Sequence, residues 1–186
     1  MINNFPQITL ENIKKIKCHH YFDNNDLNKE IQEKTIILML AAMQNRGCET
    51  VLLWKAYTQN YWISTSYDYW NVALNKEMIQ ELESYQANSY IAIHNHPMDY
   101  SFSLLDILTF LDYEKIKLLL VCTNNCKHCA AVYKNNNFNN SKIISMVVAL
   151  IRKLIAKNII NGHRDGVSLL KYLNTFGIEY IQFKNW

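Results

Sequence analysis

The amino-acid sequence predicts an α/β fold in which one mixed, largely antiparallel sheet is flanked by helices. Segments with apolar residues at helical spacing alternate along the chain with short runs rich in β-branched and aromatic residues. Short polar turns between neighbouring β-rich runs favour antiparallel pairing of the strands. The chain has 186 residues, 49% of them hydrophobic, so it is long enough to bury the core of a single domain.

The chain is expected to have three parts. Residues 1–33 form an N-terminal extension, because they are polar and contain a turn-like Asp-Asn-Asn-Asp run. Residues 34–140 form the central domain, and residues 141–186 form a C-terminal helical extension packed on the same domain. The patterns in this last part predict helices over residues 143–160 and 164–175 and a strand over residues 178–183.

The elements of the central domain follow in order from residue 35. A first helix ends at Gly47, since glycine supplies the left-handed residue that ends many helices. The β-rich runs 48–57 and 61–66 lie on either side of a polar turn and predict a hairpin. Asn75 can cap a second helix. The remaining elements are a buried strand over residues 89–93 that ends at His94, a helix that starts at Ser103, and strands over residues 117–123 and 130–134.

Composition and charge argue against several classes of protein. The 19 basic and 16 acidic residues leave a net charge of +3, which is too small and too evenly spread to indicate a polyanion-binding protein. The longest apolar stretches are shorter than the roughly 20 residues that cross a bilayer. The N-terminal residues lack the pattern of a secretory signal, so a cytoplasmic location is expected. The five cysteines are an odd number without a framework pattern, which favours reduced thiols or a metal site.

Residues 91–106, IAIHNHPMDYSFSLLD, carry most of the chemically competent side chains. His94 and His96 are two residues apart on a strand, so both imidazoles point to the same side. Asp106 is the third residue of the helix that Ser103 caps, and its carboxylate can supply a third ligand. Either pattern alone has a structural explanation, because S-x-x-D is an ordinary helix start and H-x-H is common. Together they predict a zinc site with one open position, as catalytic zinc sites have.

At these residues the sequence resembles the JAB/MPN family, whose zinc hydrolases carry the JAMM motif. That motif has an upstream Glu, then H-x-H, a seven-residue spacer and S-x-x-D. HNHP is especially similar to RadC-type and bacterial or phage members, whereas the spacer here, residues 97–102, is one residue shorter. The resemblance covers residues 35–134 and implies JAB/MPN-like layering, similar to that of cytidine deaminases. It also implies that His94, His96 and Asp106 are zinc ligands. Ser103 would be the family's hydrogen-bonding serine, which helps to bind the oxyanion.

Glu49 occupies the place of the family's catalytic glutamate, where the first helix gives way to the first strand. It is the only acidic residue between Lys34 and Asp68. A carboxylate there can take a proton from the attacking water, whose pKa a metal lowers towards roughly 7. The alternative is a solvated glutamate at the start of a strand. The resemblance favours the catalytic role.

Cys122, Cys126, His128 and Cys129 form a second candidate cluster. Two cysteines at C-x2-C spacing with a nearby histidine are typical of structural zinc sites. The alternative is a hairpin turn, in which Cys122 is a small apolar strand residue and Cys126 and Cys129 flank a basic turn. The spacing does not identify a fourth ligand, so both interpretations stay open.

These residues predict a zinc hydrolase, and the resemblance implies a metallopeptidase of the JAMM type that cleaves a peptide or isopeptide bond. The resemblance implies a protein or peptide substrate, such as the tail of a ubiquitin-like modifier. An extended tail can be held by addition to a sheet edge. The alternative is a RadC-like DNA-associated protein or a non-catalytic interaction module that retains the metal site. No stripe of basic residues with interleaved aromatic residues favours nucleic-acid binding.

Overall fold

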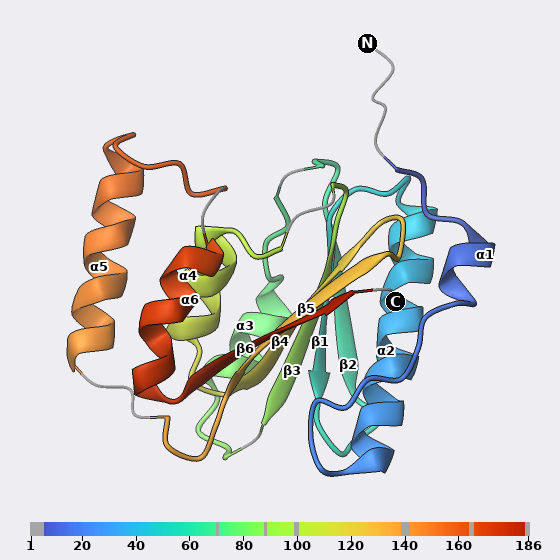
Figure 1. Ribbon diagram of the computed structural model, residues 1–186, viewed down its shortest axis with the longest axis horizontal. Coiled ribbons are helices and arrows are strands. Elements are labelled where there is room, and N and C mark those ends of the chain that lie inside the picture. The colour runs from blue at the N-terminus through green and yellow to red at the C-terminus, as the bar shows by residue number, and fades with distance from the viewer. Residues whose placement is uncertain are drawn as a thin grey trace.

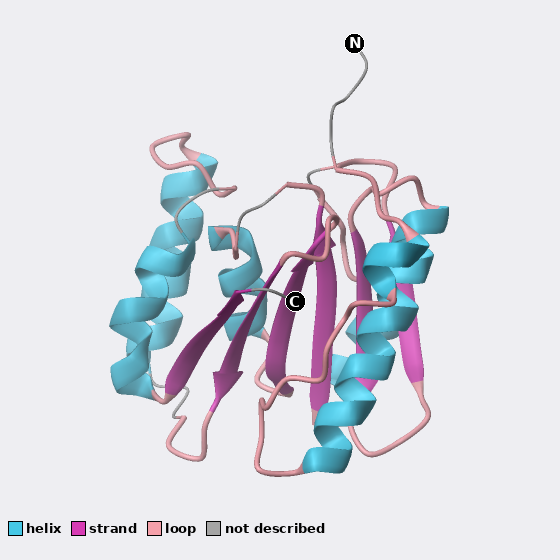
Figure 2. Ribbon diagram, turned by 45° about the vertical axis from the view of Figure 1, so that its right-hand side comes forward, coloured by secondary structure: helices cyan, strands magenta, loops and turns pink. Residues whose placement is uncertain are grey.

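The structure confirms the predicted α/β fold, with a six-stranded sheet between two layers of helices (Figure 1, Figure 2). The computed structural model describes residues 6–69, 71–87, 89–98, 101–138, 142–163 and 166–184. The strands are β1 (Thr50–Lys55), β2 (Tyr61–Thr65), β3 (Tyr90–His96), β4 (Ile116–Thr123), β5 (His128–Lys134) and β6 (Ile178–Lys184). They lie in the order β2-β1-β3-β4-β5-β6, and each neighbouring pair is antiparallel except β3 and β4.

Helices cover both faces of this sheet. They are α1 (Leu10–Ile13), α2 (Asn25–Gln44), α3 (Lys76–Glu83), α4 (Leu104–Asp112), α5 (Lys142–Ala156) and α6 (Gly166–Leu173), with a short 3₁₀ helix at Asn174–Phe176. The helices α1 and α2 pack on one face, and α3 to α6 pack on the other (Figure 1). The helix α4 connects the two parallel strands β3 and β4, as a crossover between parallel strands requires.

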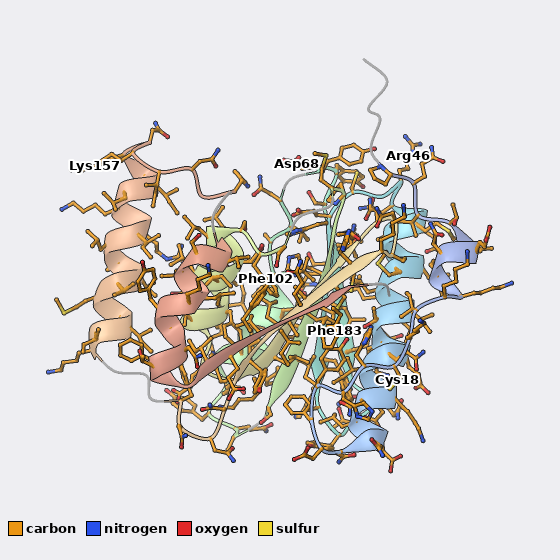
Figure 3. All side chains as sticks on the ribbon, viewed as in Figure 1. Cys18, Arg46, Asp68, Phe102, Lys157 and Phe183 are labelled. Atoms are coloured by element: carbon orange, nitrogen blue, oxygen red, sulfur yellow. The ribbon has the colours of Figure 1, made fainter. Side chains whose placement is uncertain are left out.

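The alternation of side chains along each strand creates two separate cores. Leu52 and Ile93 pack in the core beneath α2, whereas Leu53 and Ala92 pack in the core beneath α4. Figure 3 shows side chains on both sides of the sheet; Phe102 lies inside the molecule, whereas Lys157 lies at its periphery. An even-numbered residue of β3 therefore faces α4.

The helix α2 begins ten residues earlier than the sequence predicts, at Asn25, so the expected boundary at residue 33 lies inside a helix. The side chain of Asn24 caps it by accepting hydrogen bonds from the backbone N–H groups of Asp26 and Leu27. The buried polar residue Asn28 interrupts the apolar pattern that would have revealed this first half. Its amide donates to the backbone carbonyl of Phe22, 2.7 Å away, which makes its burial tolerable.

The strand β3 continues to His96, two residues beyond the expected end at His94. Pro97, which has no backbone N–H to donate to the sheet, follows it directly. The parallel strand β4 pairs with β3 as far as His96, which lies opposite Thr123. The backbone N–H of Asn124 then donates to the carbonyl of His96 over 2.9 Å.

The other elements lie close to their predicted positions. The hairpin of β1 and β2 is present, and Asn75 caps α3 by accepting a hydrogen bond from the backbone N–H of Met78. In the C-terminal part, α5 ends at Ala156, whereas residues 164 and 165 of the next predicted helix lie outside the described residues. The strand β6 pairs with β5 and forms an edge of the sheet. None of the described helices is long and apolar enough to cross a membrane.

Candidate metal centre

The two histidines of β3 lie side by side beneath α4. Their Nε2 atoms are 3.0 Å apart, and both residues are almost completely buried. This confirms the prediction that residues two apart on this strand face the same side. Asn95, between them, points to the opposite face, where its amide meets the side chain of Asn124.

The N-terminus of α4 brings Asp106 to the same point. Ser103 is the N-cap, and its Oγ accepts a hydrogen bond from the backbone N–H of Asp106 over 3.1 Å. In return, the Asp106 Oδ2 atom accepts from the backbone N–H and the hydroxyl of Ser103 at 2.7 and 2.8 Å. This capping box turns the carboxylate towards both imidazoles, with 3.4 Å from Oδ1 to His94 Nε2 and from Oδ2 to His96 Nε2.

These three side chains could hold a metal ion. With ligand bonds of about 2.0–2.2 Å, neighbouring donor atoms of a tetrahedral zinc site lie about 3.3–3.6 Å apart. The nearest donor distances here are 3.0 to 3.4 Å. Within the described residues, His94, His96 and Asp106 are the one group of three His, Cys, Asp or Glu side chains with donor atoms close enough to share an ion. Two imidazole nitrogens and one carboxylate are ligands that zinc and other divalent transition metals take.

The carboxylate of Asp106 is ready to bind a cation. Burial by itself raises its pKa, but the charge and hydrogen bonds of His94 and His96 outweigh burial and hold the pKa well below its usual value. The N-terminus of α4 also favours a negative charge at this position. Asp106 is therefore ionised throughout the neutral range, as a metal ligand must be.

Glu49 lies beside this group without belonging to it. Its Oε1 atom is 3.9 Å from Nε2 of His96, and its residue is buried. The left-handed backbone of Gly47, with φ of 77°, ends the turn after α2 and directs the chain into β1 as predicted. Hydrogen bonds of the Glu49 backbone with Asp68 and Ser66 then hold the residue at the start of the strand.

The environment of Glu49 favours its protonated form in the metal-free protein. Burial, together with the charges of Asp106 and Asp68, raises its pKa to about 8, although His96 acts in the opposite direction. A solvated glutamate, the alternative drawn from the sequence, would be exposed, whereas this side chain is 11% exposed. Glu49 is thus a buried carboxylate that faces the three potential ligands.

A network of amides on the opposite face of the sheet positions the backbone around Glu49. The Asn95 Oδ1 atom accepts from the backbone N–H of Thr50 at 2.8 Å, and its Nδ2 atom donates to the carbonyl of Cys48 at 3.3 Å. Asn124 continues the network by donating to the carbonyl of Gly47 over 2.9 Å. The sequence analysis did not identify this network, because Asn95 and Asn124 are 29 residues apart and carry no motif.

A cavity of about 400 Å³ opens at the metal centre. Glu49, Ser103 and the three potential ligands are among the residues that line it. The cavity extends between the sheet, α4 and residues 71–74, and it reaches Arg152 of α5. Residues 99 and 100 of the spacer between the histidines and Ser103 lie outside the described residues.

The structure does not bring the cysteine cluster together as a metal site. Cys122 and Cys129 oppose each other on β4 and β5, and both pack with Cys126 in the core beneath α2. Burial raises the pKa of the Cys126 thiol to about 11 and that of Cys122 well above its usual value. Within the part of the chain that is described, these residues and His128 do not form a group with converging donor atoms. The arrangement agrees with the hairpin-turn alternative.

Comparisons with family models, with curated proteins and with solved structures find no match to this chain. The geometry of the site and the motif residues are therefore the basis for any functional conclusion.

Proposed function

We propose that this protein is a zinc-dependent hydrolase that cleaves a peptide or isopeptide bond. One observation carries the proposal: two imidazoles and a carboxylate converge at 3.0 to 3.4 Å, with the separate carboxylate of Glu49 beside them and a cavity in front. Three protein ligands leave a fourth position open, which is typical of a catalytic zinc site. The resemblance of these residues to the JAMM motif supports the same reaction class.

The residues around the centre have separate roles in the proposed reaction. A zinc ion held by His94, His96 and Asp106 would polarise a carbonyl group and make a water molecule more acidic. Glu49 takes the proton of the attacking water and delivers it to the leaving nitrogen. A nearby cation favours the ionised form of this carboxylate, which offsets the burial that raises its pKa to about 8 in the metal-free protein.

Ser103 orients the carboxylate ligand. Its hydroxyl donates to Oδ2 of Asp106 and its Oγ accepts from the backbone of the same residue. Ser103 also lines the cavity, and a second rotamer that directs its hydroxyl to a bound substrate is part of this proposal. The oxyanion-binding role that the motif resemblance implies uses this second orientation.

The proposed substrate is a protein or peptide, with the tail of a ubiquitin-like modifier implied by the resemblance. Such a tail would approach beside residues 71–74, because this segment lines the cavity and lies next to β2, an edge strand of the sheet. Ser64 Oγ donates to the carbonyl of Ala73 over 2.8 Å, and Asn75 Nδ2 donates to the carbonyl of Ile63 over 3.4 Å. The same cavity is lined by the residues of the metal centre.

The test combines metal analysis with hydrolysis assays on purified protein. We expect one zinc ion per chain and cleavage of ubiquitin-like substrates with extended tails, taken from genes near that of this protein. A chelator should stop the reaction and added zinc should restore it. DNA binding is titrated in parallel at two salt concentrations, and we expect only weak, salt-sensitive binding. Protein without bound metal would overturn the proposal. Salt-resistant DNA binding without hydrolysis would overturn it and favour the RadC-like alternative.

A further inference from the structure

The cavity follows one face of α4 away from the metal centre. Asp106, Thr109, Phe110 and Tyr113 all line it, and their spacing of three, four and seven residues places them along one side of the helix. Seven residues at a rise of 1.5 Å span about 10 Å. The cavity is therefore long enough to hold a whole side chain beyond the reacting carbonyl.

Most of the cavity wall is apolar, and its acidic and basic side chains other than His163 belong to two groups, the metal centre and the pair of Asp112 and Arg152. Ten of the side chains in its wall are apolar, among them Val51, Val72, Leu74, Ile79, Ala92 and Phe110. Glu49 and Asp106 lie at the metal centre, whereas Asp112 and Arg152 form an ion pair with each other. A charged ligand group among the apolar side chains would lose its hydration without gaining a partner.

The volume suits a large side chain. A cavity of roughly 150 Å³ is enough for benzene, and this one measures about 400 Å³. Two small residues leave this space open. Ala92 lies on β3, two residues before His94 and on the same face, and Ala73 lies in the segment that borders β2.

We propose that this cavity is a specificity pocket for a large, uncharged, apolar side chain, aromatic or leucine-like, carried by the residue next to the scissile bond. Ala73 and Thr109 control its width. This inference rests on the proposed hydrolase function and adds the class of substrate that the site selects. A substrate with glycine at this position would leave the pocket unfilled and gain nothing from it.

The first test measures binding to the zinc-loaded protein and needs no turnover. Acetohydroxamate offers only a zinc-binding group, whereas 4-phenylbutanohydroxamate adds a chain that reaches into the pocket. We expect the second compound to bind about 30-fold more tightly or better, from burial of its apolar surface. Equal dissociation constants for the two compounds would overturn the pocket while leaving the metal site intact.

A variant in the cavity wall tests whether the tighter binding of the phenyl compound comes from the pocket. Ala73 is exposed outside a helix or strand, so Ala73→Trp adds bulk to the pocket wall without disturbing a core. We expect this variant to keep its zinc and its affinity for acetohydroxamate, and to reduce the advantage of the phenyl compound to about threefold or less. Thr109→Phe on α4 provides a second, independent way to fill the space. An advantage that persists in both folded variants would contradict the assignment.

The last two tests separate the pocket from the proposed reaction. A pair of peptides that differ only in Gly or Phe next to the cleaved bond should show at least about a tenfold difference in kcat/KM, in favour of Phe. If no peptide is cleaved, the hydrolase proposal fails, and 4-phenylbutan-1-ol is then titrated into the metal-free protein by NMR. Shifts of the Val72 and Leu74 methyl signals that Ala73→Trp abolishes would support the pocket, whereas unchanged signals would overturn it.

Discussion

Two clusters in this chain contain residue types that can bind metals, but only one of them brings its donor atoms together at one point. His94 and His96 meet Asp106 within 3.4 Å. The cysteines of β4, β5 and their connecting turn instead pack in the apolar core beneath α2. The first cluster combines the end of a strand with the start of a helix, whereas the second belongs to a single hairpin.

The difference follows from the alternation of side chains along a strand. In H-x-H the two ligands are two residues apart and share a face, whereas His128 and Cys129 are adjacent on β5 and point to opposite faces. The alternation therefore turns His128 away from the three cysteines, which share the core beneath α2. A short ligand motif predicts a site only together with the secondary structure that carries it.

The largest expected effect is loss of the metal from the histidine cluster. The double variant His94→Ala/His96→Ala should retain less than about 0.1 zinc per chain after dialysis, because two of three ligands are gone. The matched double variant Cys126→Ser/Cys129→Ser should retain about one. Elemental analysis measures both. The reverse result would move the metal site to the hairpin.

Glu49 tests whether the first cluster is catalytic as well as metal-binding. Glu49→Gln keeps the size of the side chain and removes the base, so turnover should fall by at least about 10²-fold with zinc still bound. Glu77→Gln, at an exposed residue in the first turn of α3, is the control and should leave turnover unchanged. Loss of zinc from the Glu49 variant would make this residue a ligand instead.

The stability of the metal-free protein should depend on Glu49 and on pH. The folded-state pKa of Glu49, about 8, lies above the ordinary value of 4.5. The contribution of its protonated side chain to the free energy of unfolding is therefore fully present below about pH 4.5 and is lost as the pH rises through 8. Between pH 5 and pH 9, Glu49→Gln should therefore gain about 2–4 kcal/mol in unfolding free energy relative to the native sequence. Urea denaturation measures this difference, and saturating zinc should reduce it. A difference independent of pH would show that Glu49 does not titrate as described.

Ser103 should have a smaller effect on both stability and metal affinity. Ser103→Ala removes the N-cap of α4, which costs about 1 kcal/mol of unfolding free energy. It also releases the carboxylate of Asp106, which should weaken zinc binding about tenfold. Ser101→Ala is the control, because the Ser101 hydroxyl contacts Tyr180 instead of the ligand group. Equal zinc affinities in the two variants would argue against an orienting role.

The smallest effect is expected in the second cluster. His128→Ala should leave the zinc content and affinity unchanged and alter the unfolding free energy by less than about 1 kcal/mol. Competition with a chromogenic chelator measures the affinity. A loss of zinc in this variant would show that the hairpin contributes a ligand.

Local geometry explains why part of the site was predictable. The strand period places His94 and His96 on one face whatever the rest of the fold does. The capping pattern likewise places Asp106 next to Ser103 at the start of a helix. Each of these relations spans four residues or fewer, so the sequence contains all the information that they need.

Longer-range relations were not predictable in this way. The true start of α2 depends on Asn28, whose burial is balanced by contacts with a preceding loop. The network of Asn95 and Asn124 joins two strands, and the cavity joins segments as distant as Ala73 and Arg152. None of these partners is marked by a local pattern.

The sequence by itself determined the α/β class, the shared face of the two histidines and the helix start that carries Asp106. Only the tertiary structure decided that Glu49 lies 3.9 Å from His96, that the cysteines enter the core, and that a cavity opens beside the metal centre. The physical reason is that local preferences act over a few residues, whereas these distances depend on the pairing of β3 with β1 and β4 and on the packing of α4 against the sheet.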